Sequence, residues 1–384
     1  MVIMLMIIHV VQQGDTVGKI AQAYGVSAET IIFDNQLPPP YSLTIGQSLL
    51  IVGAERTPLE ARNPVYIGGY AYPYISTWVL EQTLPYLTYL YIFSYGFDTD
   101  GNLIAPALDD SWMISMAGDY GVAPVMTLTP LGPDGNFNNS LITAVVNDYA
   151  ARENLRNQIM IQMEERGFEG LDIDFEYILA EDRLAFADFV WEVRTAINQL
   201  GYPVTVALAP KTSDDQPGLL YEGKDYALLG EAADEVLLMT YEWGYTYSPP
   251  MAVAPINNVR NVVEYALTRI PNEKINLGIP NYGYDWPLPY EKGVTRATTI
   301  GNVEAITIAA DNGAKIQFDE TAMTPFFNYT NNGIAHEVWF EDVRSMQAKF
   351  NLVDEYDLHG LGYWQIMRLF RANWLLLADK FFLL

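Results

Sequence analysis

Two hydrophobic patterns alternate along most of this chain. Short apolar or β-branched runs, typical of buried strands, are separated by longer stretches in which apolar residues recur with the period of an amphipathic helix. The clearest helical stretches are 141–166, 183–200 and 259–269. Alternation of this kind predicts an α/β fold, and eight repeats predict a (β/α)8 TIM barrel. The eight runs that predict strands are 65–72, 89–97, 124–128, 170–176, 204–209, 236–241, 275–280 and 360–365.

The barrel domain is expected to occupy residues 65–384, with one addition. The spacing between the seventh and eighth strand runs is wider than a single helix needs, and residues 287–338 in this gap are rich in Thr, Asn and Gly. We therefore expect an insertion there, on a loop at one end of the barrel. Residues 53–64, which precede the barrel, break both periodicities and predict a linker.

The first part of the chain follows a different plan. An apolar strand over 7–11 comes first, and Thr16 and Ser27 are residue types that cap the N-termini of helices. A second apolar strand over 49–52 completes the order strand, helix, helix, strand. This order predicts a small βααβ domain that covers residues 7–52.

The amino-acid composition excludes several classes of function and of catalytic group. The chain has 384 residues, with 21 Lys and Arg against 47 Asp and Glu, a net charge of −26, no cysteine and three histidines. Such a surface repels nucleic acid, which excludes binding by phosphate neutralisation. Without cysteine there is no disulfide or Cys-ligated metal, and the histidines lack ligand-like spacing. We expect no metal and no cofactor, so the chemistry must come from carboxylates, hydroxyls, amides and aromatic side chains.

Nothing in the sequence predicts a membrane span. A transmembrane helix needs about 20 consecutive apolar residues, and no stretch of the chain approaches that length. The apolar residues 1–11 lack the basic start and the small-residue cleavage site of a signal peptide. We expect no membrane insertion and no recognisable signal peptide.

Three carboxylates stand at every second position of the fourth predicted strand. Asp172, Asp174 and Glu176 therefore share one face of that strand, while apolar residues take the other. Inside a barrel, an unpaired charge is costly, and crowded like charges do not all ionise easily. At least one of these carboxyls should therefore keep its proton near neutral pH, as a general acid requires. Glu176, nearest to the C-terminal end of the strand, is the candidate general acid.

This strand resembles a known signature. Residues 169–176, Glu-Gly-Leu-Asp-Ile-Asp-Phe-Glu, are similar to the Asp-Gly-x-Asp-x-Asp-x-Glu motif of glycoside hydrolase family 18, the chitinase-like enzymes, with Glu169 in place of the first Asp. Residues 239–242, Met-Thr-Tyr-Glu, resemble the family's Met-x-Tyr-Asp element, with Glu242 in place of Asp. Trp364, at the end of the eighth strand, matches a third family position.

The resemblance implies roles for these residues. Family 18 enzymes use the substrate's own 2-acetamido oxygen as the nucleophile. Glu176 would protonate the leaving oxygen and then activate water, Asp174 would hold the acetamido N–H, and Asp172 would tune the charge of Asp174. Tyr241 would bond the acetamido carbonyl, and Trp364 would form the floor under the sugar. Further expected substrate contacts are Glu242, Asn281, Trp243, Trp286 and Met239.

The small N-terminal domain resembles a LysM domain, a module that binds N-acetylglucosamine units of peptidoglycan or chitin. The similarity lies in residues 9–11, 14–17, 20–21, 24–26 and 45–49 and in Ile31 and Asn35. Ile45 stands where the family usually has proline. The glycan-binding residues that it implies are Gly14, Asp15, Thr16, Ile45 and Gly46. The expected partners are therefore peptidoglycan or chitin-like polymers of N-acetylglucosamine, and no protein partner is implied.

Longer stretches narrow the resemblance within the family. The bacterial branch that includes spore-germination, cortex-lytic N-acetylglucosaminidases is resembled by residues 174–177, 209–213, 216–221, 239–244 and 278–286. Those enzymes often carry more than one LysM module. This resemblance implies hydrolysis of β-1,4 bonds after N-acetylglucosamine in spore cortex fragments, with retention of configuration. It also implies a location in the spore cortex or coat, or in the cell wall.

Two other functions remain open at this point. A chitinase or an endo-β-N-acetylglucosaminidase would act on chitin oligomers or glycoprotein glycans and leave cortex fragments intact. A lectin-like spore coat protein would bind glycans without cleaving them, and Glu176→Gln would then leave hydrolysis unchanged. The presence of Glu176 together with both aspartates argues against the lectin-like protein.

Overall fold

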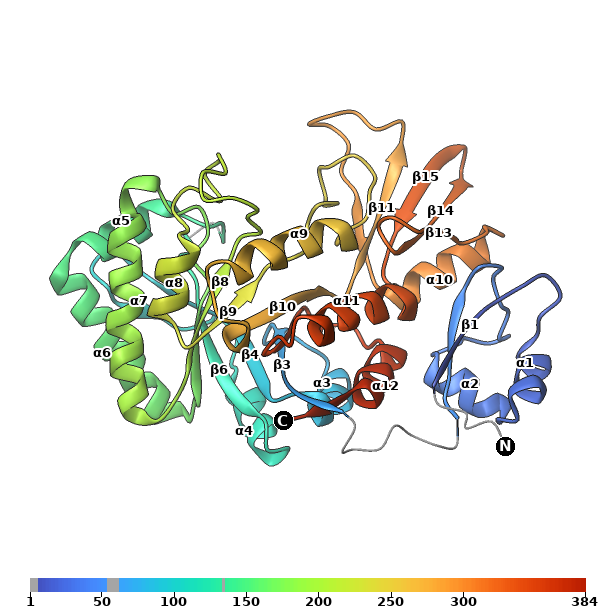
Figure 1. Ribbon diagram of the computed structural model, residues 1–384, viewed down its shortest axis with the longest axis horizontal. Helices are drawn as coiled ribbons and strands as arrows, with labels where there is room; N and C mark the ends of the chain where they lie inside the picture. The colour runs from blue at the N-terminus through green and yellow to red at the C-terminus, as the bar shows by residue number, and fades with distance from the viewer. Residues whose placement is uncertain (1–5, 54–61, 133–134) are drawn as a thin grey trace.

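The barrel predicted from the sequence is present and closed (Figure 1). The computed structural model describes residues 6–53, 62–132 and 135–384; residues 1–5, and 54–61 of the predicted linker, lie outside this part. Eight parallel strands pair in chain order, and the last pairs with the first. They are β3 (Asn63–Ala71), β4 (Tyr89–Phe97), β6 (Ala123–Leu128), β7 (Gly170–Ile173), β8 (Val204–Leu208), β9 (Glu235–Leu238), β10 (Ile275–Pro280) and β16 (Gly360–Trp364).

The strands follow the predicted runs closely, because parallel strands covered on both faces are nearly continuous in apolar residues. Three boundaries differ by two or three residues. The sixth run was predicted to extend to residue 241, but β9 ends at Leu238. The fourth run was predicted to extend to Glu176, but β7 ends at Ile173. Asn63 and Pro64 were assigned to the linker but begin β3, where the C-terminal strand β17 (Phe381–Leu383) pairs with them. The apolar end of the chain therefore packs on the barrel.

Helices cover the outside of the barrel (Figure 1). The predicted helix over 141–166 is two helices, because Asp148 ends the first and caps the second by accepting a hydrogen bond from the Ala151 amide at 2.9 Å. The barrel helices are α3 (Thr77–Thr83), α4 (Ser111–Asp119), α5 (Asn139–Asn147), α6 (Tyr149–Arg166), α7 (Arg183–Ile197), α8 (Tyr226–Ala232), α9 (Ile256–Leu267), α11 (Val343–Glu355) and α12 (Arg371–Lys380). A short strand, β5 (Leu103–Ile104), pairs with the end of β4.

The insertion is a second, antiparallel sheet with one helix. It begins at Gly283, directly after β10, and not at the predicted residue 287. Its strands are ordered β12, β11, β15, β14, β13, and β11 and β15 project beyond the barrel (Figure 1). The elements are β11 (Gly283–Leu288), β12 (Thr298–Ile300), α10 (Asn302–Asp311), β13 (Gln317–Asp319), β14 (Thr324–Asn331) and β15 (Ile334–Trp339).

The N-terminal domain has the predicted strand, helix, helix, strand order. Thr16 and Ser27 cap its helices as expected, by accepting hydrogen bonds from the Lys19 and Thr30 amides. It has a core of its own, formed by Val11, Ile20, Ile31, Leu49 and Ile51 among others. The elements are β1 (Ile7–Val10), α1 (Val17–Tyr24), α2 (Ala28–Asp34) and β2 (Ser48–Ile51).

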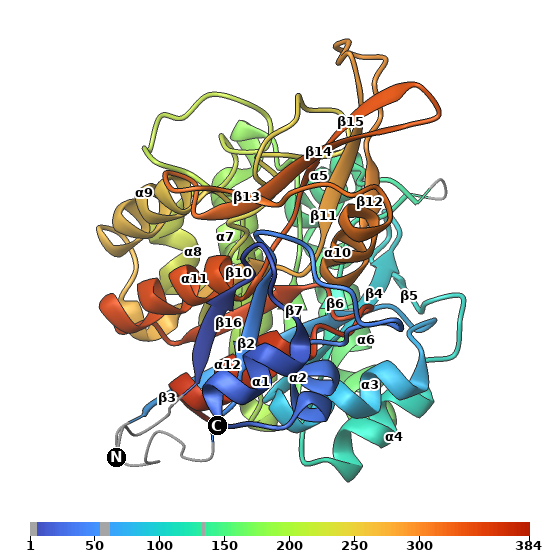
Figure 2. The same cartoon turned by 90° about the vertical axis from the view of Figure 1, so that its right-hand side faces the viewer.

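This small domain docks beside α10, α11 and α12 (Figures 1 and 2). The Ile45 carbonyl accepts a hydrogen bond from the Ile316 amide at 2.9 Å, and the Gly46 carbonyl accepts one from the Arg344 guanidinium at 3.2 Å. Gly46 has φ +86°, and a Cβ atom there would lie 1.8 Å from the Ile316 carbonyl oxygen. Only glycine fits this close approach.

A second set of docking contacts comes from the start of α12. The Arg371 guanidinium lies 3.3 Å from an Asp34 carboxylate oxygen and stacks over the Phe33 ring, and the Arg371 amide donates to the Gln36 side chain at 2.7 Å. The domain is therefore held to the barrel at two separate places.

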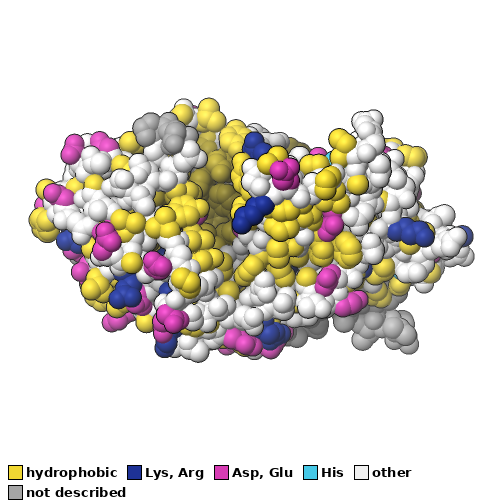
Figure 3. Space-filling model, turned by 90° about the horizontal axis from the view of Figure 1, so that it is seen from above, with side chains coloured by type: hydrophobic (Ala, Val, Ile, Leu, Met, Phe, Trp, Pro, Cys, Tyr) yellow, Lys and Arg dark blue, Asp and Glu magenta, His cyan; other side chains and the backbone are white. Residues whose placement is uncertain are grey.

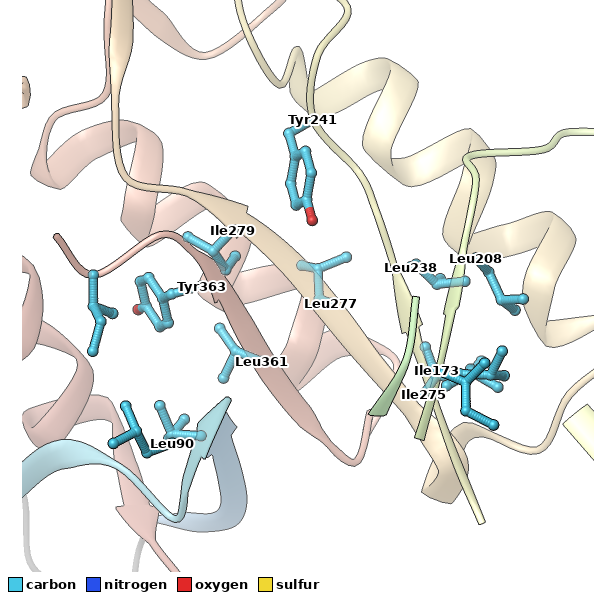
Figure 4. Packing of buried hydrophobic residues seen from close by; sticks show 14 of the residues in the cluster. Leu90, Ile173, Leu208, Leu238, Tyr241, Ile275, Leu277, Ile279, Leu361 and Tyr363 are labelled. Atoms are coloured by element: carbon cyan, nitrogen blue, oxygen red, sulfur yellow. The ribbon is translucent and has the colours of Figure 1, made fainter. Parts of the chain in front are cut away.

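One continuous apolar cluster joins the barrel strands to their helices. Figure 4 shows part of it, with Leu238, Leu277, Ile279 and Leu361 from β9, β10 and β16, and with Tyr241 above them. Within the described residues, no helix is long and apolar enough to span a lipid bilayer.

Candidate active site

The end of β7 aims carboxylates into the barrel because Phe175 anchors it from outside. The Phe175 ring is fully buried and stacks on Phe186 and Phe189, with ring centres 5.5 and 5.8 Å away. With Phe175 packed against helix α7, the residues on either side, Asp174 and Glu176, turn to the opposite face. The sequence therefore directs these carboxylates inward through an apolar side chain.

Asp172 is the deepest of the three carboxylates. It is fully buried, and it accepts a hydrogen bond from the Tyr70 hydroxyl at 3.0 Å. Burial raises its pKa well above the ordinary value, and Asp174 raises it further. Tyr70 comes from β3, on the far side of the barrel, so the hydrogen bond crosses the interior.

Asp174 and Glu176 have raised pKa values for related reasons. Burial raises the pKa of Asp174 to about 6, against the lowering effect of the positive charge on Lys224. Burial raises the pKa of Glu176 to about 8, with further raising by Asp174 and Glu242 and a lowering by Lys224. Near pH 7, one carboxyl of the pair is therefore ionised while the other keeps its proton, which is the division that acid catalysis requires.

Tyr241 and Glu242 line the same pocket as Glu176. Glu242 has φ +65°, and its carboxylate accepts hydrogen bonds from the Tyr282 and Tyr284 hydroxyls. Tyr241 is 8% exposed, and β10 passes close to its ring at Gly278, where a Cβ atom would lie 2.9 Å from the ring. Glycine at that position leaves room for the Tyr241 side chain.

Trp364 ends β16 within a group of aromatic rings. Its ring centre lies 5.0 Å from that of Phe93, 5.7 Å from that of Tyr70 and 6.1 Å from that of Tyr72. Trp364 is half-buried, so part of the indole remains open to solvent. An aromatic face of this kind suits stacking on the C–H face of a sugar.

Half of the ten predicted catalytic and substrate-binding residues line one pocket. Glu176, Met239, Tyr241, Glu242 and Trp243 all line it, and its other lining residues are Pro210, Leu220 and Tyr221. Figure 3 looks onto the face from which β11 and β15 project and shows a deep hollow lined largely by hydrophobic side chains.

Two predicted substrate contacts lie elsewhere. Trp286 is fully buried, and its indole N–H donates to the Ser248 carbonyl at 2.8 Å, so the prediction that it contacts substrate is wrong. Asn281 is buried, and its amide N–H groups donate to the Gln365 and Arg368 carbonyls at 3.1 and 2.9 Å. Asn281 therefore fixes the chain that follows Trp364.

The residues predicted to bind glycan in the N-terminal domain divide into two groups. Gly14, Asp15 and Thr16 form a hydrogen-bonded turn in which Asp15 accepts from the Gln12 amide at 2.7 Å and from His9 at 3.1 Å. Ile45 and Gly46 instead face the insertion through the docking contacts described above. The sequence pattern did not indicate this docking role.

Several residues of the site were missed from the sequence. Tyr70, Tyr282 and Tyr284 bond the buried carboxylates, and Lys224 is a fully buried cation. Tyr70 could have been found, because it occupies an inward position near the end of the first barrel strand. Nothing in the local pattern around Lys224 marks it as buried. Among the described residues, no group of three or more His, Asp or Glu side chains is placed to hold a metal ion.

A TIM barrel with a carboxylic acid kept protonated at the C-terminal end of a strand, beside an open aromatic cleft, is the arrangement of a glycoside hydrolase. The chain belongs to glycosyl hydrolases family 18, whose family model matches residues 130–368. The LysM domain model matches residues 9–52.

Relatives of known name cover nearly the whole chain. It is 41% identical to the cortical fragment-lytic enzyme of Bacillus subtilis strain 168, over 97% of this chain and 98% of that protein. It is 35% identical to the enzyme of the same name from Bacillus anthracis, over 97% of both proteins. The crystal structure of the Bacillus cereus spore cortex-lytic enzyme SleL superposes with a TM-score of 0.94, at 31% identity and with 99% of each chain covered.

Proposed function

We propose that this enzyme hydrolyses the β-1,4 bond that follows N-acetylglucosamine in peptidoglycan, and that its substrates are spore cortex fragments. The observation that carries the proposal is the pair Asp174 and Glu176, whose raised pKa values divide one proton between them near neutral pH. Likeness over nearly the whole chain to two enzymes named as lytic for cortical fragments supports the choice of substrate.

Glu176 is the general acid and base. In its protonated form it donates to the glycosidic oxygen as the bond to the leaving sugar breaks. In the second step the ionised Glu176 accepts a proton from water, which attacks the sugar and restores the starting protonation state. Glu176 is only partly buried and lines the pocket, which supports this role because both the leaving sugar and water must reach it.

The substrate supplies the nucleophile. The 2-acetamido oxygen closes on the anomeric carbon, as in other family 18 enzymes, and the configuration at that carbon is retained overall. Ionised Asp174 accepts a hydrogen bond from the acetamido N–H and stabilises the positive charge of the cyclic intermediate. The Tyr241 hydroxyl donates a hydrogen bond to the acetamido oxygen. Burial raises the pKa of this hydroxyl, so it keeps its proton.

This mechanism constrains which bond is cleaved. The sugar on the Trp364 side of the bond must carry an N-acetyl group. Muramic-δ-lactam units of spore cortex have lost that group, so they cannot occupy this position. Cleavage should therefore leave N-acetylglucosamine, and not a muramic residue, at the new reducing end.

We further propose that the LysM domain holds the enzyme on the glycan and that the enzyme works in the spore cortex or the cell wall. The net charge of −26 does not attract peptidoglycan, which itself carries carboxylates. Neutral sugar contacts must therefore provide the affinity. The Gly14–Thr16 turn, which makes none of the docking contacts described above, is the candidate contact in this domain.

Digestion of cortex fragments tests the function directly. We expect the wild-type enzyme to release fragments whose reducing ends, labelled by borohydride reduction and identified by mass spectrometry, are N-acetylglucosaminitol. Glu176→Gln is the matched control and should release none. Reduced muramic ends would contradict the proposal. Cleavage of chitin oligosaccharides without cleavage of cortex fragments would favour a chitinase instead.

A further inference from the structure

Lys224 is a buried cation that the mechanism above does not use. It lies in the loop between β8 and α8, directly before Asp225, the residue that caps α8. Its side chain is fully buried, and its ammonium group donates a hydrogen bond to the Ala207 carbonyl at 2.5 Å. Within the part of the chain that the structure describes, no carboxylate oxygen lies within 4.0 Å of this ammonium group.

The contact with Ala207 places the Lys224 ammonium beside the catalytic strand. In the pairing of β7 with β8, Ile173 lies opposite Val206, so Ala207 is level with Asp174. Burial lowers the pKa of the Lys224 ammonium, and the negative charges of Asp174, Glu176 and Asp172 oppose this lowering and favour the charged form. The ammonium therefore lies against β8, the strand next to β7, where its charge acts on all three carboxylates.

The other two buried lysines of the described chain are satisfied in a different way. Lys349 forms an ion pair with Glu341 at 2.7 Å. Lys211 donates to the backbone carbonyls of Asp214 and Lys224 at 3.2 and 2.9 Å. The Lys224 ammonium has three hydrogens and only the Ala207 carbonyl as a hydrogen-bond acceptor among the described residues. An uncharged side chain could donate that one hydrogen bond to Ala207. The hydrogen bond therefore does not explain why a lysine is buried at this position.

We propose that Lys224 is a positioning residue for hydrolysis: its ammonium is the counter-charge of the three carboxylates and allows Asp174 to be ionised beside a protonated Glu176. This inference rests on the proposed function, because it assigns a role to Lys224 through those two carboxylates. The distance beyond 4.0 Å fits such a role. A direct ion pair would hold one carboxylate permanently ionised, whereas a charge further away in a medium of low dielectric constant acts on all three.

The sign of the effect follows from the charges. Lys224 lowers the pKa of Asp174 and of Glu176, while burial raises both and Glu242 also raises that of Glu176. Removal of the ammonium charge therefore raises both values. The low-pH limb of the activity profile, where Asp174 becomes ionised, and the high-pH limb, where Glu176 loses its proton, should both move to higher pH.

The test compares three variants by the pH dependence of kcat/KM on cortex fragments. Lys224→Gln keeps a donor for the Ala207 carbonyl but removes the charge, and we expect both limbs to move up by about one pH unit. Lys224→Arg keeps the charge, so the low-pH and high-pH limbs of its profile should lie where those of the wild type lie. Lys211→Gln is the matched control, because Lys211 is buried in the same loop and its charge acts on Asp225, Asp214, Asp215 and Arg183, not on the three carboxylates.

Two outcomes would overturn the inference: unmoved limbs in Lys224→Gln, or equal movement of the limbs in Lys211→Gln. Both leave the proposed function intact as long as the wild type releases N-acetylglucosamine ends, so the two failures are distinguishable. If Lys224→Gln does not fold, nitrogen-15 NMR of the lysine ammonium groups replaces it. Asp174→Asn should then lower the pKa of Lys224, and an unchanged value would contradict the inference.

Discussion

Two groups of buried carboxylates lie in this protein, and they are stabilised in opposite ways. One group, Glu341 and Asp342, precedes α11 beneath the docked LysM domain. Glu341 forms an ion pair with Lys349 at 2.7 Å, and Asp342 pairs with Arg344 at 2.6 Å. Asp342 also caps α11 by accepting from the Arg344 and Ser345 amides. Each of these carboxylates has a cation in direct contact.

The other group is Asp172, Asp174 and Glu176 at the end of β7. No direct ion pair joins any of the three to a cation among the described residues. An oxygen atom of Asp172 and one of Asp174 are buried without a hydrogen-bond partner there, as is one oxygen atom of Glu341 in the other group. Buried carboxylates normally have such partners, and a folded protein loses stability where they do not. The two groups therefore differ in their cations: Glu341 and Asp342 each have one in direct contact, whereas the carboxylates proposed to be catalytic have none among the described residues.

The largest expected effect is a loss of activity, which should follow substitution in the β7 group but not in the group at α11. Glu176→Gln should lower kcat by about 10²–10⁴-fold, because a positioned general acid contributes that much. Glu341→Gln should leave kcat per folded molecule close to wild type, since Glu341 does not line the cleft pocket. It should instead lower the free energy of unfolding by about 3–5 kcal/mol, because Lys349 is left buried without its partner. Assays of cortex fragment hydrolysis and urea denaturation measure the two effects.

The reverse pattern would break the comparison. One such result is a loss of activity in Glu341→Gln while it remains fully folded, and another is retained activity in Glu176→Gln. In either case, the absence of a direct ion pair would not distinguish the catalytic carboxylates from the structural ones.

A smaller effect concerns stability against pH. Burial raises the pKa of Glu176 from 4.5 to about 8, so folded Glu176 stabilises the protein fully below pH 4.5 and loses that contribution as pH rises through about 8. Glu176→Gln cannot ionise and avoids this loss. We expect its Tm to exceed that of the wild type by roughly 1–3 °C at pH 9 and by little at pH 4, measured by calorimetry. A Tm difference independent of pH would contradict the raised pKa of Glu176.

The barrel could be predicted from the sequence because its strands and helices repeat one pattern. The hydrophobic pattern predicts the ends of helices and strands less accurately where polar side chains or turns end them. Asp148 divides the predicted helix over 141–166 because its side chain caps the second half. β7 stops at Ile173, and the chain after Glu176 turns sharply, with Tyr177 at φ +58°. Such ends depend on side-chain hydrogen bonds and turns that a hydrophobic period does not contain.

The site was predictable where its residues alternate along one short segment, as Asp172, Asp174 and Glu176 do at the end of β7. It was not predictable where partners come from distant segments. Trp286 is a residue type that often lines sugar-binding clefts, but here it belongs to the insertion sheet and is fully buried. Only the tertiary structure shows this burial. Lys224 looks like a surface lysine in the sequence, and Gly46 looks like a loop glycine. Both are explained by neighbours that lie far away along the chain.

The central claim is that Asp174 and Glu176 divide one proton between them near neutral pH, and the pH dependence of wild-type kcat/KM on cortex fragments tests it most directly. Ionisation of Asp174 should produce a rise near pH 6, and loss of the Glu176 proton should produce a fall near pH 8, which together give a bell-shaped profile. A rate that stays constant from pH 7 to about pH 10, beyond the value raised by burial, would contradict the claim.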